Sequence, residues 1–333
     1  MATDVSSQPT DTRGEAKALS DAATTAGRAP SIHNTQPWRW RLTGNELDLY
    51  LDHRRGLEVT DPDSRLAILS CGAALHHALV SLAAAGWHTI LARMPDPAHP
   101  DHLAQLRLDH RVPVTPAAIR HLQTIGLRHT DRRPTASTPI DADKLHSIVA
   151  AVESAGAGLH LLRPDQVYDL AGAADKAQRT ETEEVAWQAE LAYWTGGTRP
   201  LGSGIPDAAI PEQATQTTVP GRDFGHQGDL PVSEAHENAA VFAILYGSED
   251  GAMDWLRTGE ALSAAWLTAT ELGLSVLPLS ATIEVAVTRE GMRRLLSGLG
   301  HPHLVLRFST ADPAGTAAPH TPRLPTDQVI ERE

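Results

Sequence analysis

The chain has 333 residues, of which 41% are hydrophobic, and this is enough for two domains of ordinary size with a substantial core. Its formal net charge is −13 and no block of basic residues occurs, which argues against a protein that binds the phosphate backbone of nucleic acid. No apolar run approaches the roughly 20 residues needed to cross a bilayer, and the N-terminus lacks the charged-then-apolar order of a signal peptide. We therefore expect neither nucleic acid nor a membrane as a partner.

The cysteine and histidine content bears on the redox compartment and on metal binding. The only cysteine is Cys71, so the chain can form neither an intrachain disulfide nor a cysteine-based metal cage, and the cytoplasm is the expected location. The 17 histidines are scattered, without a His-x-x-x-His spacing. His76 and His77 are adjacent, so they point in different directions on a helix. We predict no metal site.

Hydrophobic periodicity and turn residues predict an α+β unit in the first part of the chain. The predicted elements are a helix over residues 14–26, a hairpin with strands over residues 38–42 and 47–51, a helix over residues 65–85, and strands over residues 87–93 and 102–109. The third of these, residues 65–85, consists of small and apolar residues, and we expect it to be a buried helix.

A second set of elements follows, interrupted by one long segment without a pattern. The predicted helices cover residues 116–125, 141–155, 166–194, 251–272 and 288–299, and the predicted strands cover residues 158–163, 239–246 and 303–308. Residues 196–238, which we call the lid segment, are rich in Gly and Pro. A segment this long is either functional or disordered. Its apolar residues offer points at which it can dock, namely Ile205, Ile210, Val219, Phe224 and Leu230.

The two buried helices carry an internal repeat at a constant separation of 187 positions. The matching residues are Gly72, Ala74, Leu75, Ala78 and Gly86 in the first copy, and Gly259, Ala261, Leu262, Ala265 and Gly273 in the second. A gapless match that includes both terminal glycines favours a duplicated unit folded as an intrachain pseudo-dimer. We place the first repeat at residues 1–115 and the second at residues 116–333.

The loop over residues 29–40 reads APSIHNTQPWRW and holds the densest polar chemistry of the chain. Pro30 and Pro37 stiffen its ends. Between them lie five hydrogen-bonding side chains that suit the polar edge of a planar ligand: Ser31, His33, Asn34, Thr35 and Gln36. The alternative is an ordinary helix-to-strand loop with polar filler.

This string resembles the PS-x-x-N-x-QPW loop of the FMN-dependent nitroreductase family, and most closely its Acg-like branch, in which two nitroreductase domains are fused in one chain. The resemblance implies an α+β, nitroreductase-like fold of two fused repeats. It also implies that the loop lies over the flavin ring of FMN between the two domains. The contacts implied in this loop are Pro30, Ser31, Ile32, His33, Asn34 and Gln36.

A second motif suits the FMN phosphate. The string Arg-His-Thr-Asp-Arg over residues 128–132 resembles the family's Arg-x-Ser-x-Arg motif. In an extended segment Arg128, Thr130 and Arg132 lie on one side and Arg133 points the other way. The planar guanidinium of arginine can donate two parallel hydrogen bonds to phosphate oxygens, and Thr adds a hydroxyl donor. The alternative is an exposed basic loop.

The positions of the two motifs predict the number of sites. The flavin-ring loop occurs once, in the first half, and the phosphate motif once, in the second. In ordinary members of the family these two pieces come from different subunits. The sequence therefore predicts one complete flavin site and one degenerate site per chain.

Two further segments resemble parts of the family's site. The tail over residues 320–323 resembles a basic segment that reaches the phosphate, with Arg323 as the cation, although Leu324 occupies the position of a second cation. A solvated tail is an equally good interpretation. Residues 277–280 match a loop whose backbone amide meets the flavin N5, with Ser280 as the first choice and Leu279 as the second.

Two functions from different classes remain open. One is an oxidoreductase in which NAD(P)H reduces FMN and the flavin reduces a nitro or quinone-type acceptor, without any catalytic side chain. The other is an FMN-binding or storage protein whose lid restricts turnover. A pure interaction protein is the weakest interpretation. We expect a monomer that mimics a dimer.

Overall fold

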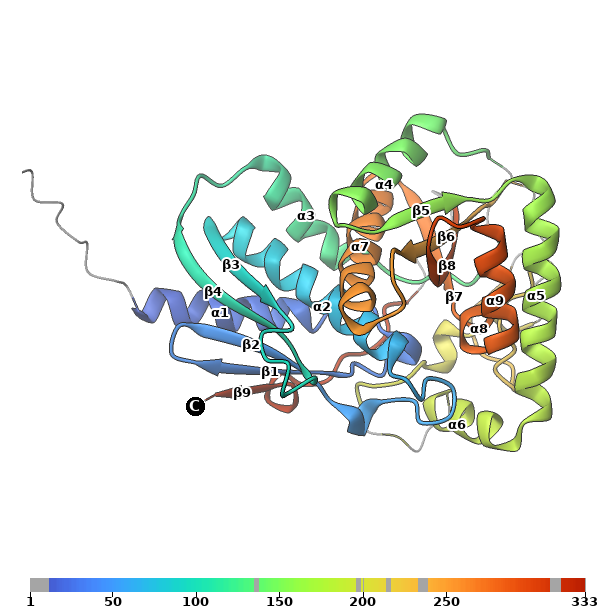
Figure 1. Ribbon diagram of the computed structural model, residues 1–333, viewed down its shortest axis with the longest axis horizontal. Helices are drawn as coiled ribbons and strands as arrows, with labels where there is room; N and C mark the ends of the chain where they lie inside the picture. Colours follow the sequence, from blue (N-terminus) through green and yellow to red (C-terminus); the bar gives the residue numbers. More distant parts are fainter. Residues whose placement is uncertain are drawn as a thin grey trace, which may run out of the picture.

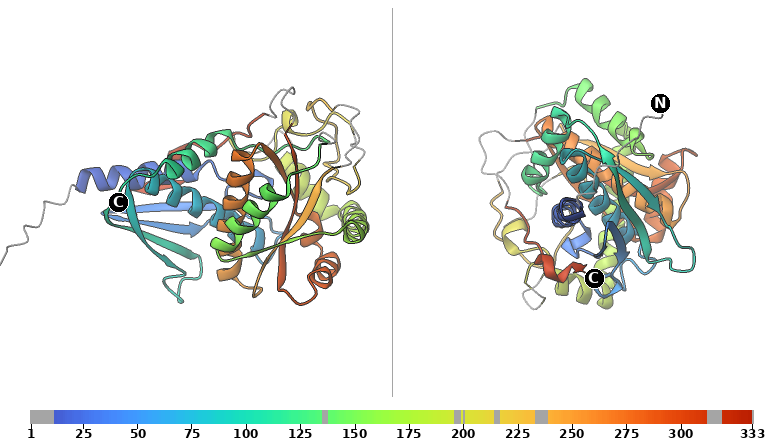
Figure 2. Two further views of the ribbon diagram at one scale, coloured as in Figure 1. Left: turned by 90° about the horizontal axis from the view of Figure 1, so that it is seen from above. Right: turned by 90° about the vertical axis from the view of Figure 1, so that its left-hand side faces the viewer.

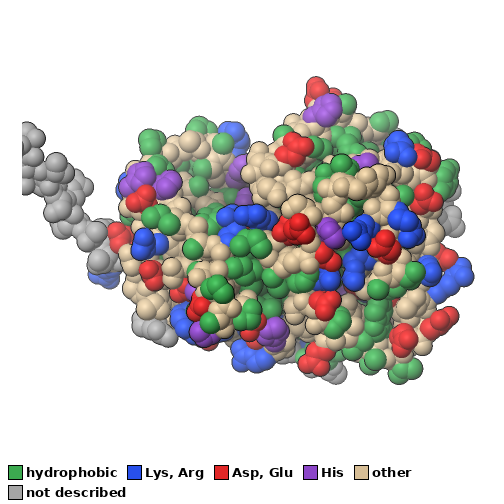
Figure 3. Space-filling view, viewed as in Figure 1, with side chains coloured by type: hydrophobic (Ala, Val, Ile, Leu, Met, Phe, Trp, Pro, Cys, Tyr) green, Lys and Arg blue, Asp and Glu red, His purple; other side chains and the backbone are tan. Residues whose placement is uncertain are grey.

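The computed structural model describes residues 12–134, 138–195, 199, 201–213, 217–232, 239–311 and 319–332. These residues form two α+β halves, one on each side of a central pair of long helices, α2 (Arg65–Ala84) and α7 (Ala252–Glu271) (Figure 1). On the face in Figure 3, acidic and basic side chains are intermingled rather than separated into areas of one sign. Residues 1–12 are rich in Ser, Thr and Asp, and the sequence predicts a frayed end there; residues 1–11 lie outside the described residues, and Thr12 is the first residue of α1.

All elements predicted for the first half are present. They are α1 (Thr12–Ala26), β1 (Trp38–Thr43), β2 (Glu46–Leu51), α2, β3 (Trp87–Arg93) and β4 (His102–Arg111). The β1–β2 hairpin forms because Gly44 adopts a φ of 59°, a left-handed conformation that suits glycine. Short 3₁₀ helices lie before β1, at Ile32–Asn34, and after β2, at His53–Arg55.

The second half contains the predicted elements with four differences. Its elements are α3 (Pro116–Leu127), α4 (Ala142–Ser154), β5 (Gly158–Leu161), α5 (Pro164–Glu183), α6 (Val185–Thr195), β6 (Val241–Gly247), α7, β7 (Leu274–Leu279), α8 (Ala281–Glu284), α9 (Ala286–Leu295), β8 (His301–Thr310) and β9 (Ile330–Arg332). The single helix predicted over residues 166–194 is two helices, because Glu184 has an extended backbone. The short helix α8 and the strand β9 were not predicted, and the segment that leads out of α7 is the strand β7.

Both halves have the same sheet topology. The first sheet has the order β3-β4-β2-β1-β9, and the second has the order β5-β6-β8-β7. The strands β1, β2, β3 and β4 correspond to β5, β6, β7 and β8. Without β9, the two sheets then have the same order. All the neighbouring pairs in both are antiparallel. This agreement supports the internal duplication. β9 pairs in parallel with β1, so the end of the described chain lies in the first sheet. The boundary at residue 115 remains a proposal.

The two central helices meet at the repeated glycines. A Cβ atom on Gly72 would lie 2.0 Å from the carbonyl oxygen of Leu256, and one on Gly259 would lie 1.9 Å from the carbonyl oxygen of Leu69. Leu69 and Leu256 occupy equivalent positions of the repeat, as Gly72 and Gly259 do. Reciprocal contacts of this kind are what an approximate twofold axis through the helix crossing produces. We infer the pseudo-dimer from them.

The helix α2 is long and apolar enough to cross a membrane by length and composition, which the sequence analysis did not anticipate. In the most apolar 18-residue stretch of this helix, 83% is buried inside the protein. It packs against α1, α3 and α7, so it is apolar on all sides because it is surrounded by protein. This confirms the prediction of a buried helix over residues 65–85.

The lid segment occupies the place of a tight turn. In the first half, β1 and β2 are joined at Gly44 and Asn45, whereas the equivalent strands β5 and β6 are joined by α5, α6 and the lid segment. Figure 2 shows the described parts of this segment, in yellow, gathered on one side of the molecule. The insertion therefore belongs to one half only.

Candidate functional site

A cavity of about 660 Å³ lies between the two halves, within the usual range for small-molecule sites. Its wall is formed by the loop after α1, the segment after α3, the lid segment, the end of β7, the tail, and residues of α2 and α7. The candidate residues that line it are Pro30, Ser31, Ile32, His33, Asn34, Arg128, Thr130, Arg132, Leu279, Ser280 and Arg323. The structure thus brings together segments that are far apart in the sequence.

The backbone of the loop is in a costly conformation. His33, Asn34 and Gln36 have φ values of 43°, 56° and 54°, in the left-handed region that non-glycine residues seldom occupy. Such a residue costs on the order of 1–3 kcal/mol and persists only where its surroundings hold it. The Oγ atom of Ser31 accepts a hydrogen bond from the backbone N–H of Gln36 at 3.0 Å and closes the loop on itself.

Asn34 is held by the lid segment and the tail. Its Nδ2 donates to the carbonyl oxygens of Gly204 at 2.9 Å and Pro322 at 3.0 Å, and its Oδ1 accepts from Nη1 of Arg323 at 3.1 Å. The amide was expected to serve the ligand. In the structure it lines the cavity but fixes the lid segment and the tail to the loop.

Gln36 was expected to contact the flavin, and the structure places it outside the cavity wall. The side chain is buried, its Nε2 donates to the carbonyl oxygen of Gly202 at 2.7 Å, and its Oε1 accepts from the backbone N–H of Leu324 at 2.9 Å. The correction has a simple physical cause. A buried amide must satisfy its own hydrogen bonds, and the neighbouring backbone does so here.

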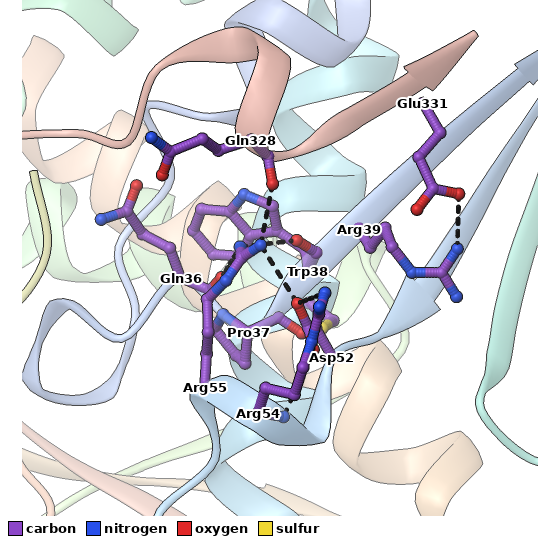
Figure 4. Close-up of polar contacts among 10 residues, drawn as sticks. Gln36, Pro37, Trp38, Arg39, Asp52, Arg54, Arg55, Gln328 and Glu331 are labelled. Atoms are coloured by element: carbon purple, nitrogen blue, oxygen red, sulfur yellow. Dashed lines mark hydrogen bonds and ion pairs between the residues drawn. The ribbon is translucent and has the colours of Figure 1, made fainter. Parts of the chain in front are cut away.

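Arg55 holds the end of the loop and was not found from the sequence. Its Nη1 donates to the carbonyl oxygens of Gln36 at 3.0 Å and Trp38 at 3.2 Å, and its Nη2 donates to that of Gln328 at 2.9 Å (Figure 4). An ion pair with Asp52, at 3.1 Å, places the guanidinium among these carbonyls. Bonds to backbone oxygens leave no sequence pattern, so no motif pointed to Arg55.

Arg128 is buried, and among the described residues it has no carboxylate partner. Its guanidinium lies 4.6 Å from the ring centroid of Trp266, and Nη2 donates a long hydrogen bond of 3.4 Å to the carbonyl oxygen of Arg28. Its Nε has no hydrogen-bond partner in the part of the chain that the structure describes. Burial, and then the charge of Arg323, lower the pKa of Arg128 to about 9. A buried cation in this condition needs an anion.

Arg132 and Arg323 add to this positive charge. Nη1 of Arg132 donates to the carbonyl oxygen of Ala209 at 3.0 Å. Arg323 donates to the carbonyl oxygen of Ala29 and to Oδ1 of Asn34, and its Nε has no partner among the described residues. Burial is the first cause that lowers the pKa of each arginine to about 10. Neither forms an ion pair with a carboxylate in the part of the chain that the structure describes.

Arg133 lies outside the cavity wall, as the alternation of side chains predicts. Its Nη2 lies 2.6 Å from Oδ2 of Asp131.

Arg307 on β8 was not found from the sequence. It lines the cavity, and its Nη2 donates to the carbonyl oxygens of Asp131 at 3.1 Å and Arg133 at 2.8 Å. These bonds hold the candidate phosphate motif in place.

Arg222 of the lid segment lies in the cavity wall between buried carboxylates. Its Nη2 lies 2.6 Å from both carboxylate oxygens of Glu284 and 3.3 Å from Oε1 of Glu181, and its Nη1 lies 3.4 Å from Nε2 of His33. Burial, and then the charge of Arg222, keep the pKa of His33 well below its ordinary value, so the imidazole is neutral. Arg222 therefore connects the lid segment to both sides of the cavity.

The apolar residues of the lid segment are buried as predicted: Ile205, Ile210, Val219, Phe224 and Leu230. Ile205, Ile210 and Phe224 pack with Ala209 and with Leu191 of α6. The described parts of the segment are thus docked on the protein. Residues 196–198, 200, 214–216 and 233–238 of the segment lie outside the described residues.

The repeat allows the equivalent region of the other half to be compared. The position equivalent to Ser280 is Arg93, and the position equivalent to Glu260 is Ala73. Nε and Nη2 of Arg93 donate to the two carboxylate oxygens of Glu260 at 2.7 and 2.8 Å. In the first half, the residue at the position of Ser280 is therefore an arginine that is held in an ion pair with Glu260.

The flavin-ring loop also has no counterpart of similar length. The loop between α1 and β1 covers residues 27–37, whereas the equivalent connection between α4 and β5 covers residues 155–157. A connection this short has no room for the polar residues of the candidate site. The residues that would correspond to the phosphate motif precede α1 and lie outside the described residues.

These observations define an α+β protein with two like halves and one cationic cavity between them. No family model matches the chain. "Putative NAD(P)H nitroreductase Rv3131" of Mycobacterium tuberculosis is 35% identical over 322 residues, which are 95% of this chain and 92% of the relative. "Putative NAD(P)H nitroreductase acg" of the same species is 33% identical over 96% of this chain and 97% of the relative. The chain belongs to the nitroreductase family, in the Acg-like branch of these mycobacterial proteins.

Among solved structures, the FMN and NADPH-dependent nitroreductase NfnB from Sphigopyxis sp. strain HMH matches with a TM-score of 0.39 and 17% sequence identity. The match covers 63% of this chain and 97% of NfnB.

Proposed function

We propose that the protein binds one FMN per chain in the cavity between its halves and acts as an NAD(P)H-dependent oxidoreductase on nitro or quinone-type acceptors. The observation that carries the proposal is the set of cations in the cavity wall, Arg128, Arg132 and Arg323, which have no carboxylate partners among the described residues. A phosphate dianion would supply the missing negative charge. The names of the mycobacterial relatives support the choice of nitroreductase chemistry.

The residues present fit the parts of FMN. Arg128, Thr130, Arg132 and Arg323 would hold the phosphate, residues 30–34 would lie against the ring, and the backbone at Leu279 and Ser280 would face N5. Bound FMN would supply the hydride chemistry. The chain itself binds and orients the ligand and excludes water from the cavity.

The first experiment measures stoichiometry and reduction. Apoprotein titrated with FMN should saturate near one equivalent, and NADH or NADPH added without oxygen should then bleach the flavin's visible absorbance. A yellow complex that neither nucleotide reduces would contradict the enzyme but leave the binding site intact. Saturation at two equivalents, or no complex, would contradict the single site.

The second candidate function is an FMN-binding protein with restricted turnover. The contacts of Arg222 with Glu284 and Glu181, together with the bond from Asn34 to the carbonyl oxygen of Gly204, favour it because they fasten the lid segment beside the cavity. A nicotinamide must come within roughly 3–3.5 Å of the flavin to transfer hydride. A closed lid segment would prevent this approach.

Shortening the lid segment separates the two functions. Replacing residues 206–238 by a Gly/Ser linker keeps Gly202 and Gly204, which Gln36 and Asn34 need. If the lid segment restricts turnover, the shortened protein should retain FMN and be reduced faster by NAD(P)H. Fast reduction of nitroaromatics by the intact protein, unchanged by the deletion, would leave the plain enzyme as the function.

We place this activity in the cytoplasm, where the buried thiol of Cys71 stays reduced. We further propose that the working form is a monomer, because both motifs of the site are on one chain.

A further inference from the structure

The first residues of β3 and the last residues of β4, at the ends remote from the turn that joins these strands, bring together three side chains able to bind a metal, outside the residues that line the cavity. They are His88 on β3 and Asp109 and His110 on β4, all exposed. Nδ1 of His88 lies 3.1 Å from Oδ2 of Asp109, and Nδ1 of His110 lies 2.9 Å from the same oxygen. The two imidazole rings are stacked with centroids 4.8 Å apart. The histidine spacing along the sequence gave no sign of this cluster.

A β-bulge explains how three side chains converge. Trp87 pairs with Arg111 and Thr89 pairs with Leu108, so one residue of β3, His88, faces two residues of β4. Consecutive residues of a regular strand point to opposite faces. The extra residue changes this alternation locally, so that Asp109 contacts Nδ1 of His88 and the ring of His110 stacks on the ring of His88.

Next to the cluster, Arg111 of β4 connects its strand to Trp87 of β3 and to Ala85. The guanidinium of Arg111 lies 3.8 Å from the ring centroid of Trp87, and its Nη1 donates to the carbonyl oxygen of Ala85 at 2.8 Å. Arg107 and Arg111 are equally near to Asp109 in the sequence, and each has another contact, Arg111 with Trp87 and Ala85 and Arg107 with Oε1 of Glu46 at 4.0 Å. Among the described residues, the ion-pair contacts of Asp109 are with His88 and His110.

We propose that His88, Asp109 and His110 form a surface site for a divalent transition-metal ion of the Zn²⁺ type. Ligands at bond lengths of about 2.0–2.2 Å in a tetrahedron lie roughly 3.3 Å from one another. The two measured N···O separations, 3.1 and 2.9 Å, are within a few tenths of this value. All three ligand atoms lie within 4.8 Å of one another. Small side-chain rotations complete the site, and water fills the remaining position.

Other exposed histidines supply a matched control. His53 contacts Asp101 and His99 contacts Asp96, each with one carboxylate. Neither pair belongs to a group of three possible ligands among the described residues. The double variant H53A/H99A therefore removes as many histidines as H88A/H110A but leaves the proposed site intact.

The test is a competition titration of tag-free protein with Zn²⁺ and a chromophoric chelator. The wild type and H53A/H99A should bind one equivalent, and H88A/H110A and D109N should bind it at least tenfold more weakly. Zn²⁺ should also raise the melting temperature of the first two proteins only, because a ligand stabilises the state that binds it. Melting without metal shows that each variant is folded.

Equal Zn²⁺ affinity of the wild type and H88A/H110A would overturn the proposal. So would an equal loss in H53A/H99A, which would show non-specific binding by surface histidines. The FMN titration of each variant should be unchanged, since the cluster does not line the cavity.

Discussion

Arg128 and Arg132 are alike in charge but have different surroundings. Arg128 is buried, lies over Trp266 and is close enough to Arg323 for that charge to lower its pKa. Arg132 bonds to the carbonyl oxygen of Ala209 in the lid segment. The two arginines of one motif therefore connect the candidate phosphate site to two different parts of the chain.

Replacement of Arg128 or Arg132 by Ala should weaken FMN by roughly tenfold or more and riboflavin much less, because riboflavin lacks the phosphate. A charge-assisted hydrogen bond is worth about 1.5–3 kcal/mol. Fluorescence titration with both ligands checks this. R133A is the matched control, since Arg133 pairs with Asp131 outside the cavity. Equal losses for FMN and riboflavin would mean that the arginines serve folding.

Replacement of Arg55 by Met should destabilise the fold. The carbonyl oxygens of Gln36, Trp38 and Gln328 would lose a donor, and each unsatisfied buried group costs about 1–3 kcal/mol. Some of this is recovered from water, so we expect a loss of about 2–4 kcal/mol in a urea titration. The neighbouring Arg54 is exposed, and among the described residues its side chain bonds to Asp52 alone. R54A should change stability little, and a similar effect of both variants would contradict the role of Arg55.

The candidate site was predictable where residue types form a compact motif. The loop over residues 30–34 and Arg128, Thr130 and Arg132 all line the cavity. Gln36 was misjudged because its partners, at Gly202 and Leu324, are backbone groups from distant segments. Arg55, Arg222 and Arg307 were missed for the same reason. Long-range bonds to backbone oxygens or buried carboxylates have no local signature.

The helices α2 and α7 approach each other closely at the glycines of the repeat. A Cβ on Gly72 would overlap the carbonyl oxygen of Leu256 at 2.0 Å, and backbone atoms cannot rotate away. The helices would have to separate. Each half contributes one of these helices, and both helices line the cavity. The separation would therefore also disturb the cavity wall at Leu69 of α2 and Leu262 of α7.

Gly72→Ala should therefore destabilise the protein by about 3 kcal/mol, near the upper end for overpacking. Gly172 in α5 is the matched control, because a Cβ there meets nothing within 4 Å. G172A should stabilise the helix by roughly 0.5–1 kcal/mol. Thermal unfolding of both variants tests this. A neutral effect of G72A would contradict the contact.

The burial of Glu181 beside Arg222 of the lid segment should make lid opening depend on pH. Burial raises the pKa of Glu181 to about 7 from its ordinary 4.5, so the closed state holds a proton that an exposed Glu181 would release. The closed state is favoured fully below pH 4.5, and this advantage is lost as the pH rises through about 7. Quenching of bound flavin by iodide should increase from pH 5 to 8. E181Q should flatten the profile, and an unchanged profile would contradict this role of Glu181.

Elements with strong periodicity were predicted well, and short elements were not. The buried helices and the antiparallel strands follow from their apolar spacing. β9 has three residues and forms only because β1 offers a free edge from a distant part of the chain. The break between α5 and α6 at Glu184 has no Gly or Pro to mark it, so the sequence predicted one helix.

At the scale of the molecule, both halves of the candidate site belong to one chain. The loop over residues 30–36 lies in the first half, and the arginines lie in the second half and the tail. In a true dimer such a site would be lost on dilution. Here its assembly is intramolecular.

FMN affinity should therefore be constant over a roughly hundredfold range of protein concentration. Titrations at the two limits, with size-exclusion chromatography at the same concentrations, check this. An affinity that falls on dilution together with the apparent mass would show that a second chain contributes to the site.

The position of β9 has a consequence for biosynthesis. Translation proceeds from the N-terminus, so β1 and the polar loop before it leave the ribosome long before Arg323 and β9 exist. Until then, β1 exposes an unpaired edge and Asn34 lacks its partners from the tail. Residues 320–332 therefore complete the cavity wall and the first sheet later in synthesis than the loop and the strand that they contact. A nascent chain can form its earlier helices and most of its first sheet, and under the proposed function it should bind FMN tightly only once this segment has paired with β1 and with Asn34.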